Sequence, residues 1–142
     1  MKTIYLKESE AVRNWYVIDA SDKSLGRVAS KVAFMLRGKH KSSFTPNQEM
    51  GDFIVIINVD KIAVTGNKVE DKMYYKHTGF VGGLKAHNYA KLAEKHPEKP
   101  LQLAIKGMLP NGRLGSKLLK NVKIYAGSEH PHAAQNPQPL EV

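Results

Sequence analysis

The clearest pattern in the chain is a run of apolar positions with helical spacing between residues 25 and 36. Its members recur three or four residues apart, and they are Leu25, Val28, Ala29, Val32, Ala33 and Leu36. Such a stripe is typical of a surface helix that packs one face onto a core. Residues 21–24 supply capping side chains before the stripe, and Gly38 is a natural stop after it, so we expect a helix over 25–37.

A predicted strand lies on each side of this helix. Residues 15–19 are predicted to form a buried strand, and residues 53–57 are a continuous apolar run rich in β-branched side chains. A run of that kind fits a strand that is buried on both faces, as in a parallel sheet. The order strand, helix, strand predicts a βαβ unit with a right-handed crossover. Trp15 and Phe53 are expected to lie in the core.

The rest of the chain has shorter and weaker patterns. The predicted elements are, in order, a third strand over 72–77, a glycine-rich loop over 78–83, a short helix over 88–94, a helix that begins near Pro100 with the stripe Leu101, Ala104, Ile105 and Met108, a short basic helix over 114–120 and a final strand over 122–125. The tail from about Gly127 is predicted to be irregular. Residues 1–142 are predicted to form a single domain.

Charge is segregated along the chain. The net charge is +9, from 22 Lys and Arg against 13 Asp and Glu. Two blocks, residues 23–41 and 99–128, hold 12 of the basic residues and none of the acids, so the remainder of the chain is net acidic. Separation of this kind is what a polyanion-binding surface needs, and it favours nucleic acid as the partner.

The strongest candidate for phosphate contact is the segment 37–41, where four cationic or potentially cationic side chains leave the end of the predicted helix. Some of this charge could instead complement the helix dipole. In the second block Arg113 is the one arginine able to grip a phosphate with two donors, although the block could also be a solvated basic helix. The predicted RNA-binding residues are Lys23, Arg27, Lys31, Arg37, Lys39, His40, Lys41, Lys68, Lys76, His77, Lys106, Arg113, Lys117, Lys120 and Lys123.

Other candidate chemistry is weaker. The aromatic residues within 74–77 could stack on unpaired RNA bases, while at least one of these tyrosines is expected in the core. The glycines of 79–83 match neither a P-loop nor a dinucleotide fingerprint. His130 and His132 could ligate a metal, but no third strong ligand is evident, so a structural or RNA-facing pair is favoured. No catalytic carboxylate pair and no metal site are predicted.

Composition excludes several classes of protein. The chain has no cysteine, which excludes disulfides and thiolate catalysis. Its N-terminal residues have no apolar signal core, and its longest apolar runs are far too short to cross a bilayer. We therefore expect a soluble, intracellular protein.

Several ordered motifs carry a resemblance to a known family. They are the segments 36–41, 45–46, 51–55, 64–68, 74–79, 106–110, 122–127 and 129–135. Together they resemble the large-subunit ribosomal protein numbered thirteen in the bacterial series, along essentially the whole chain. One departure is Asn111-Gly112, where the family commonly has Lys-Gly, and Arg113 is a reasonable substitute for the lost cation.

The resemblance implies an α/β fold, a three-layer α/β/α domain around a mostly parallel four-stranded sheet. It also implies a cytoplasmic, structural constituent of the large ribosomal subunit with an early part in assembly. The implied partners are ribosomal RNA and neighbouring ribosomal proteins, with no cofactor, no membrane and no small-molecule substrate. Two other functions are compatible with a basic α/β protein, a small phosphate-handling enzyme and a protein that binds acidic membranes. Neither a reactive constellation nor an insertion helix supports them.

Overall fold

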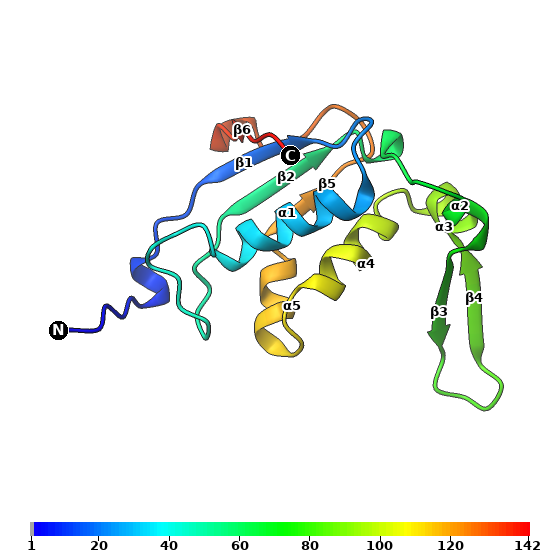
Figure 1. Ribbon diagram of the computed structural model, residues 1–142, viewed down its shortest axis with the longest axis horizontal. Coiled ribbons are helices and arrows are strands. Elements are labelled where there is room, and N and C mark those ends of the chain that lie inside the picture. Colours follow the sequence, from blue (N-terminus) through cyan, green and yellow to red (C-terminus); the bar gives the residue numbers. More distant parts are fainter. Residues whose placement is uncertain (1) are drawn as a thin grey trace.

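The protein is built around a four-stranded parallel sheet with helices on its faces (Figure 1). The structure is a computed structural model and describes residues 2–142. The strands stand in the order β5-β2-β1-β6, and their bounds are β1 (Trp15–Asp19), β2 (Phe53–Ile57), β5 (Val122–Ile124) and β6 (Gln138–Pro139). The helices are α1 (Leu25–Arg37), α2 (Lys68–Asp71), α3 (Tyr89–Lys95), α4 (Lys99–Met108) and α5 (Arg113–Leu119). This architecture confirms the expected α/β/α fold with a four-stranded sheet.

The predicted βαβ unit is present. β1 and β2 are parallel neighbours with Trp15 opposite Phe53, and α1 connects them. Every residue of the predicted apolar stripe of α1 is buried. Gly38 ends the helix in the left-handed conformation, with φ of 76°, as its position after the stripe predicted.

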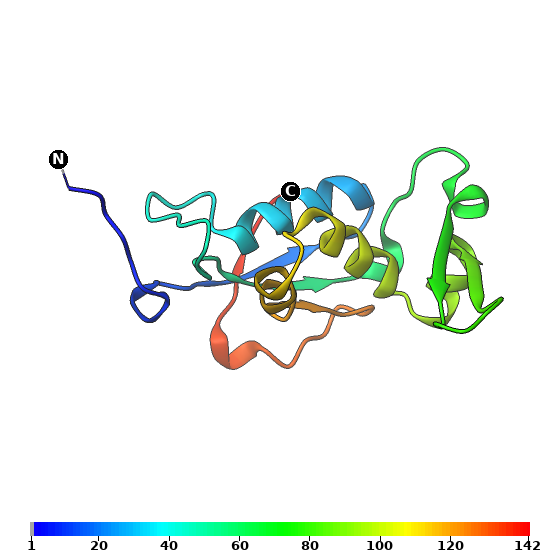
Figure 2. The same cartoon turned by 90° about the horizontal axis from the view of Figure 1, so that it is seen from below.

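The two faces of the sheet are covered differently, as the edge-on view in Figure 2 shows. Ile18, Ile54 and Ile56 face the main core, which α1, α4 and α5 complete. Because side chains alternate along a strand, Trp15 and Phe53 face the other way. Their rings stack on each other at 4.8 Å under the C-terminal segment, and both stay partly exposed. The prediction that Trp15 and Phe53 lie in the core is therefore wrong.

The C-terminal segment adds more structure than the sequence suggested. It contains a short 3₁₀ helix, η3 (Ala133–Gln135), and the edge strand β6, which pairs with β1 in parallel. The backbone N–H of Leu140 donates to the carbonyl of Val17 at 2.9 Å. Two further 3₁₀ turns are η1 (Glu8–Glu10) and η2 (Val59–Lys61).

The strand predicted over 72–77 exists, but it lies outside the main sheet. It is β3 (Met73–His77), which pairs antiparallel with β4 (Leu84–Asn88), a strand that the sequence analysis missed. The glycine-rich residues 78–83 form the hairpin loop, as expected. At the base of the hairpin the Asn88 side chain accepts the Lys91 N–H at 3.0 Å and so caps α3.

The remaining predicted elements agree with the structure, with one exception within α4. The helices α3, α4 and α5 and the strand β5 lie where the sequence placed them, to within a residue or two. Leu101 and Ile105 are buried on α4, but Met108 is 47% exposed instead of completing the stripe. Its side chain lines surface hollows beside α1.

The end of α1 packs so closely against the segment before β2 that no side chain fits between their backbones. A Cβ atom added to Gly51 would lie 1.7 Å from the carbonyl oxygen of Leu36. A Cβ atom on Gly38 would meet the backbone of Met50 at 2.9 Å. Two glycines therefore allow the helix end and this segment to touch through their backbones.

Gly51→Ala should destabilise the protein by about 3 kcal/mol or more, because the methyl group forces the helix end and the β2 segment apart. Gly107 is a matched control, since a Cβ atom there meets nothing within 4 Å and its φ is not positive. Gly107→Ala should stabilise the protein by about 0.5 kcal/mol or more through helix propensity. Urea denaturation of both variants measures the two effects, and equal midpoints would contradict the close backbone contact.

Candidate nucleic-acid interface

The outer side of α1 presents cations that make no ion pair within residues 2–142. Lys23 lies just before the helix and is partly exposed, while exposed Arg27 and partly exposed Lys31 lie on it. Lys39 follows the helix end and is exposed. A hollow of about 570 Å³ at the start of α1 is lined by Lys23 and Arg27, together with the acid Asp22. The structure thus brings these four predicted residues to one helix and its ends.

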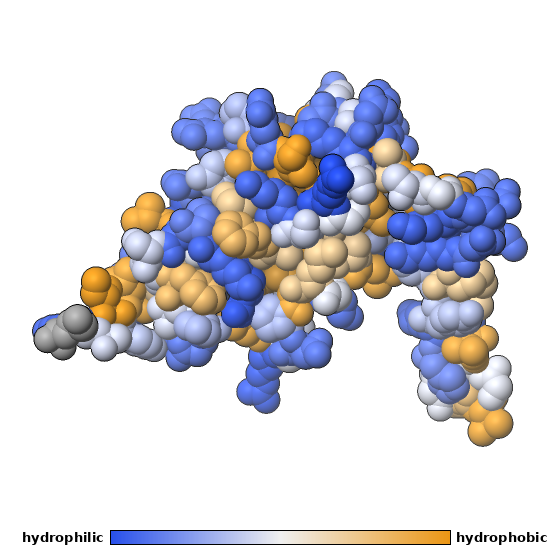
Figure 3. Space-filling model, in the orientation of Figure 1, coloured by the Kyte–Doolittle hydropathy of each residue, from blue (hydrophilic) through white to orange (hydrophobic). Residues whose placement is uncertain are grey.

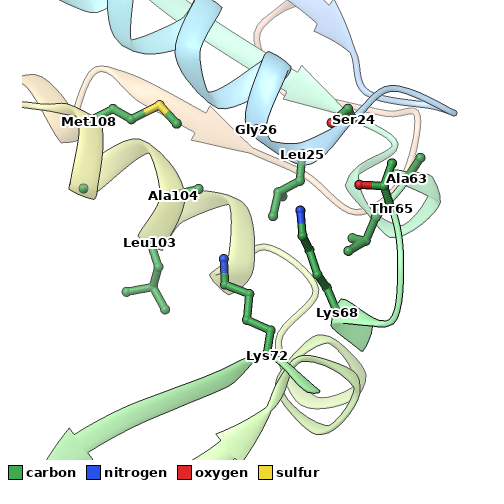
Figure 4. A pocket seen from close by; sticks show the side chains of 12 residues that line it. Ser24, Leu25, Gly26, Ala63, Thr65, Lys68, Lys72, Leu103, Ala104 and Met108 are labelled. Atoms are coloured by element: carbon green, nitrogen blue, oxygen red, sulfur yellow. The ribbon is translucent and has the colours of Figure 1, made fainter. Parts of the chain in front are cut away.

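A second hollow, of about 390 Å³, lies between the start of α1, the segment after Ala63 and α4. Figure 4 shows the ammonium groups of Lys68 and Lys72 pointing into it, opposite the apolar side chains of Leu25 and Met108. Lys68 was predicted from the sequence, and Lys72 was missed. The hollow combines two cations with an apolar wall, a lining that suits a ligand with both anionic and apolar parts.

His40 and Lys41, at the end of the first basic block, turn inward. The Asp52 carboxylate is fully buried, and it lies 2.7 Å from Lys41 Nζ and 2.7 Å from His40 Nε2. Lys41 also donates to the carbonyl oxygens of Val12 and Met50, at 2.6 and 3.0 Å. The side chains of His40 and Lys41 therefore have structural partners already, and their RNA contact stays a prediction. Arg37 is an intermediate case, neither paired with a buried acid in the described chain nor fully exposed. Its guanidinium lies 5.5 Å from the ring centre of Phe44.

A second buried carboxylate, Glu49, engages Lys117 from the second basic block. Lys117 Nζ lies 2.9 Å from the Glu49 carboxylate. The same carboxylate accepts hydrogen bonds from Arg13, at 3.0 Å, and from the side-chain amide of Asn121. Burial acts to raise the pKa of Glu49, but hydrogen bonds from Asn121 and Lys117 and the charge of Arg13 outweigh it, so the pKa is lowered. The pKa of Lys117 is raised by its hydrogen bonds to Glu8 and Glu49.

The other cations of the second block do not gather on one face. Lys106 is exposed on α4 and borders a small hollow shared with Gly112, next to Arg113 at the start of α5. Lys120 follows α5 and is exposed. Lys123 lies on β5, where the alternation with the buried Val122 directs it to the opposite face of the sheet.

The hairpin carries a third basic stretch that the sequence analysis passed over. Residues 72–93 contain four lysines, two histidines and no acid. The predicted residues Lys76 and His77 are exposed on β3, and Lys85 lies directly opposite Lys76 on β4. The signal that points to Lys85 is the same absence of acids, although this stretch has four lysines where each of the other two blocks has six Lys and Arg.

The histidine pair near the C-terminus has a structural setting. His132 Nε2 and the Tyr125 hydroxyl are 2.7 Å apart, and the His132 ring stacks on Trp15 at 5.3 Å. Burial, with the charges of His130 and Lys123, lowers the pKa of His132 and so favours the neutral ring. Among residues 2–142 there is no group of three side chains placed to hold a metal. None of the helices described is long and apolar enough to cross a membrane.

Lys39 and Lys41, two positions apart in sequence, should differ in their contribution to folding stability. Lys41→Met should cost about 3 kcal/mol of folding free energy, because it leaves the buried Asp52 carboxylate with one cationic partner fewer. Lys39→Met should change stability by less than about 0.5 kcal/mol, because Lys39 makes no ion pair in the described chain. Denaturant titration gives both values, and similar losses at the two positions would refute the distinction.

Comparison with known proteins agrees with the motif pattern. Residues 13–131 match the family model of ribosomal protein L13. The chain is 66% identical over 142 residues to the large ribosomal subunit protein uL13 of Treponema denticola, with all of both chains covered. It is 59% identical to the uL13 protein of Treponema pallidum subsp. pallidum over 99% of both chains, and 54% identical to that of Alkalilimnicola ehrlichii over all of both. The chain therefore belongs to the ribosomal protein L13 family, as its motifs predicted.

Proposed function

We propose that this protein is a structural constituent of the large ribosomal subunit that binds ribosomal RNA in the cytoplasm and takes part in early subunit assembly. Its family is one of structural ribosomal proteins and not of enzymes, and the relatives above are named as large-subunit proteins. The observation that carries the RNA contact is the row of cations on α1 without ion pairs in the described chain. Ribosomal RNA and neighbouring ribosomal proteins are the proposed partners.

The first proposed contact surface is the α1 surface, which consists of Lys23, Arg27, Lys31, Lys39 and the nearby Lys68. The helix holds Arg27 and Lys31 at a fixed spacing, with Lys23 just before it and Lys39 just after it, so that the group fits a particular arrangement of phosphates. Recognition would depend on the shape and backbone of the folded RNA, because side chains cannot reach the bases in the deep major groove of an A-form helix.

The second proposed surface is smaller than the sequence suggested. Its members are Lys106, which lines a small hollow with Gly112, the adjacent Arg113 at the start of α5, and Lys120 just after α5. Lys117 contributes indirectly, because its ion pairs with Glu8 and Glu49 link α5 to the N-terminal segment and to the segment before β2. Two cationic surfaces on one rigid body can neutralise phosphates of separate RNA segments, and this would favour the compact RNA that early assembly requires.

Binding to ribosomal RNA should be strongly salt-dependent, since each phosphate contact releases counterions. With about six contacts, affinity should fall roughly a thousandfold between 50 and 200 mM salt. Arg27→Gln should lower the slope of log affinity against log salt by about one. Lys95→Gln is the matched control, because Lys95 is exposed between Glu94 and Glu98 and lies on neither surface.

Fluorescence anisotropy with labelled large-subunit RNA measures these slopes for the wild type and both variants. A flat salt response of the wild type would refute the electrostatic mechanism. A slope that changes equally for Arg27→Gln and Lys95→Gln would show that α1 is not the contact surface.

A further inference from the structure

The β3–β4 hairpin projects from the body of the protein with large apolar side chains in solvent (Figure 1). Tyr75 is 66% exposed, Phe80 is 77% exposed and Val81 is fully exposed. Figure 3 shows the hydrophobic surface at the far end of the hairpin. Only its base is anchored, through Tyr74, which packs against the core. Apolar surface held out on a projecting element marks a binding site more often than a structural feature.

One face of the hairpin is cationic. Lys76 stands directly opposite Lys85 in the antiparallel register, and Tyr74 stands opposite His87 on the same face. Like charges at opposed positions destabilise a hairpin. No acid occurs between residues 72 and 93, and neither lysine makes an ion pair within residues 2–142. Binding of a polyanion would remove the repulsion between Lys76 and Lys85. The charge of this face therefore favours a polyanionic partner.

The other face and the tip of the hairpin are mostly apolar and aromatic. Tyr75 and Leu84 lie on this face with Met73 and Ala86, and Phe80 lies in the loop; the polar residues of the face are His77, opposite Leu84, and Asn88 at the base. The exposed rings and the lysines lie on opposite faces of the hairpin, so RNA that surrounds it can stack unpaired nucleobases on one face and place phosphates against the cations on the other. Paired bases in a duplex offer no free ring face to such side chains.

We propose that the hairpin inserts as a finger into a non-duplex part of folded RNA. Phosphates lie against Lys76 and Lys85, and unpaired bases stack on Tyr75 and Phe80. The inference rests on the proposed RNA-binding function and adds the class of RNA feature that this element recognises. It also assigns Lys85 and Phe80 to the interface, together with Tyr75, whose stacking on RNA bases the sequence had suggested.

The test compares two labelled probes on the full chain, an oligouridylate of about twelve nucleotides and a blunt RNA duplex of similar length. The double variant Tyr75→Ala, Phe80→Ala should bind the single strand about tenfold or more weakly, since stacking is lost at both rings. Its affinity for the duplex should stay within about twofold of the wild type, because the α1 surface is intact. Fluorescence anisotropy at fixed low salt gives both affinities.

Three controls separate stacking from other effects. Tyr5→Ala removes another exposed tyrosine, whose hydroxyl accepts a bond only from Gln48, and should leave both affinities unchanged. The variant Tyr75→Phe keeps the ring and should retain single-strand binding. Thermal unfolding followed by circular dichroism should show that the double variant is as stable as the wild type, since both rings are exposed.

Each contrary outcome has a definite meaning. Unchanged single-strand affinity of the double variant would overturn the finger proposal, while duplex binding by the wild type would leave the proposed function standing. Failure of the wild type to bind either probe would overturn both. Unchanged RNA affinities with loss of the double variant from purified large subunits would assign the apolar face to a protein neighbour, and so would also overturn the proposal.

Discussion

Two buried carboxylates hold together the end of the molecule where the strands begin. Asp52, which directly precedes β2, binds Lys41 and His40. Glu49, three residues earlier, binds Arg13 before β1 and Asn121 before β5. A buried carboxylate without partners would cost several kcal/mol, so the chain must bring these groups to it in order to fold. The path from the end of α1 to β2 is fixed by this requirement and by the close contact of Gly38 and Gly51 with their backbone neighbours.

This constraint divides the cations of the chain into two kinds. Lys41 and Lys117 neutralise buried or partly buried acids, and their removal should act mainly on stability. Arg27, Lys31 and Lys39 have no such acid within residues 2–142, and their removal should act mainly on RNA affinity. The buried contacts of Lys41 also fix the position of Lys39, because the two residues belong to the same short segment after α1. A single basic block therefore contains both the internal ion pairs and the proposed binding surface.

The sequence predicted those elements whose formation depends on the pattern of side chains within the element itself. The helix over 25–37 and the strands β1 and β2 follow from side-chain periodicity and β-branched content, and the structure confirms them. The edge strands β4 and β6 were missed, because a short strand without apolar alternation forms only when a neighbouring strand supplies its hydrogen bonds. Trp15 and Phe53 were misplaced because period-two patterns show which residues share a face and not which face is covered.

The candidate site was only partly predictable for a related reason. The absence of acids in a block shows where charge collects along the chain, but it does not show which distant acid folds back onto it. Lys117 is paired with Glu8 and Glu49, both far away in sequence. Conversely, Lys72 and Lys85 were not predicted, because their stretch has four lysines where each of the two blocks has six Lys and Arg, although it is equally free of acids.

The most direct test of this division of cations is amine-reactive labelling of each lysine, measured by mass spectrometry in the free protein and in purified large ribosomal subunits. We expect Lys41 to be protected in both states, because Asp52 and two backbone carbonyl groups hold its ammonium group. Lys31, Lys39 and Lys106 should react in the free protein and become protected in the subunit. The account would be contradicted if Lys41 reacted as readily as Lys39 in the free protein, or if Lys31, Lys39 and Lys106 stayed equally reactive in the subunit.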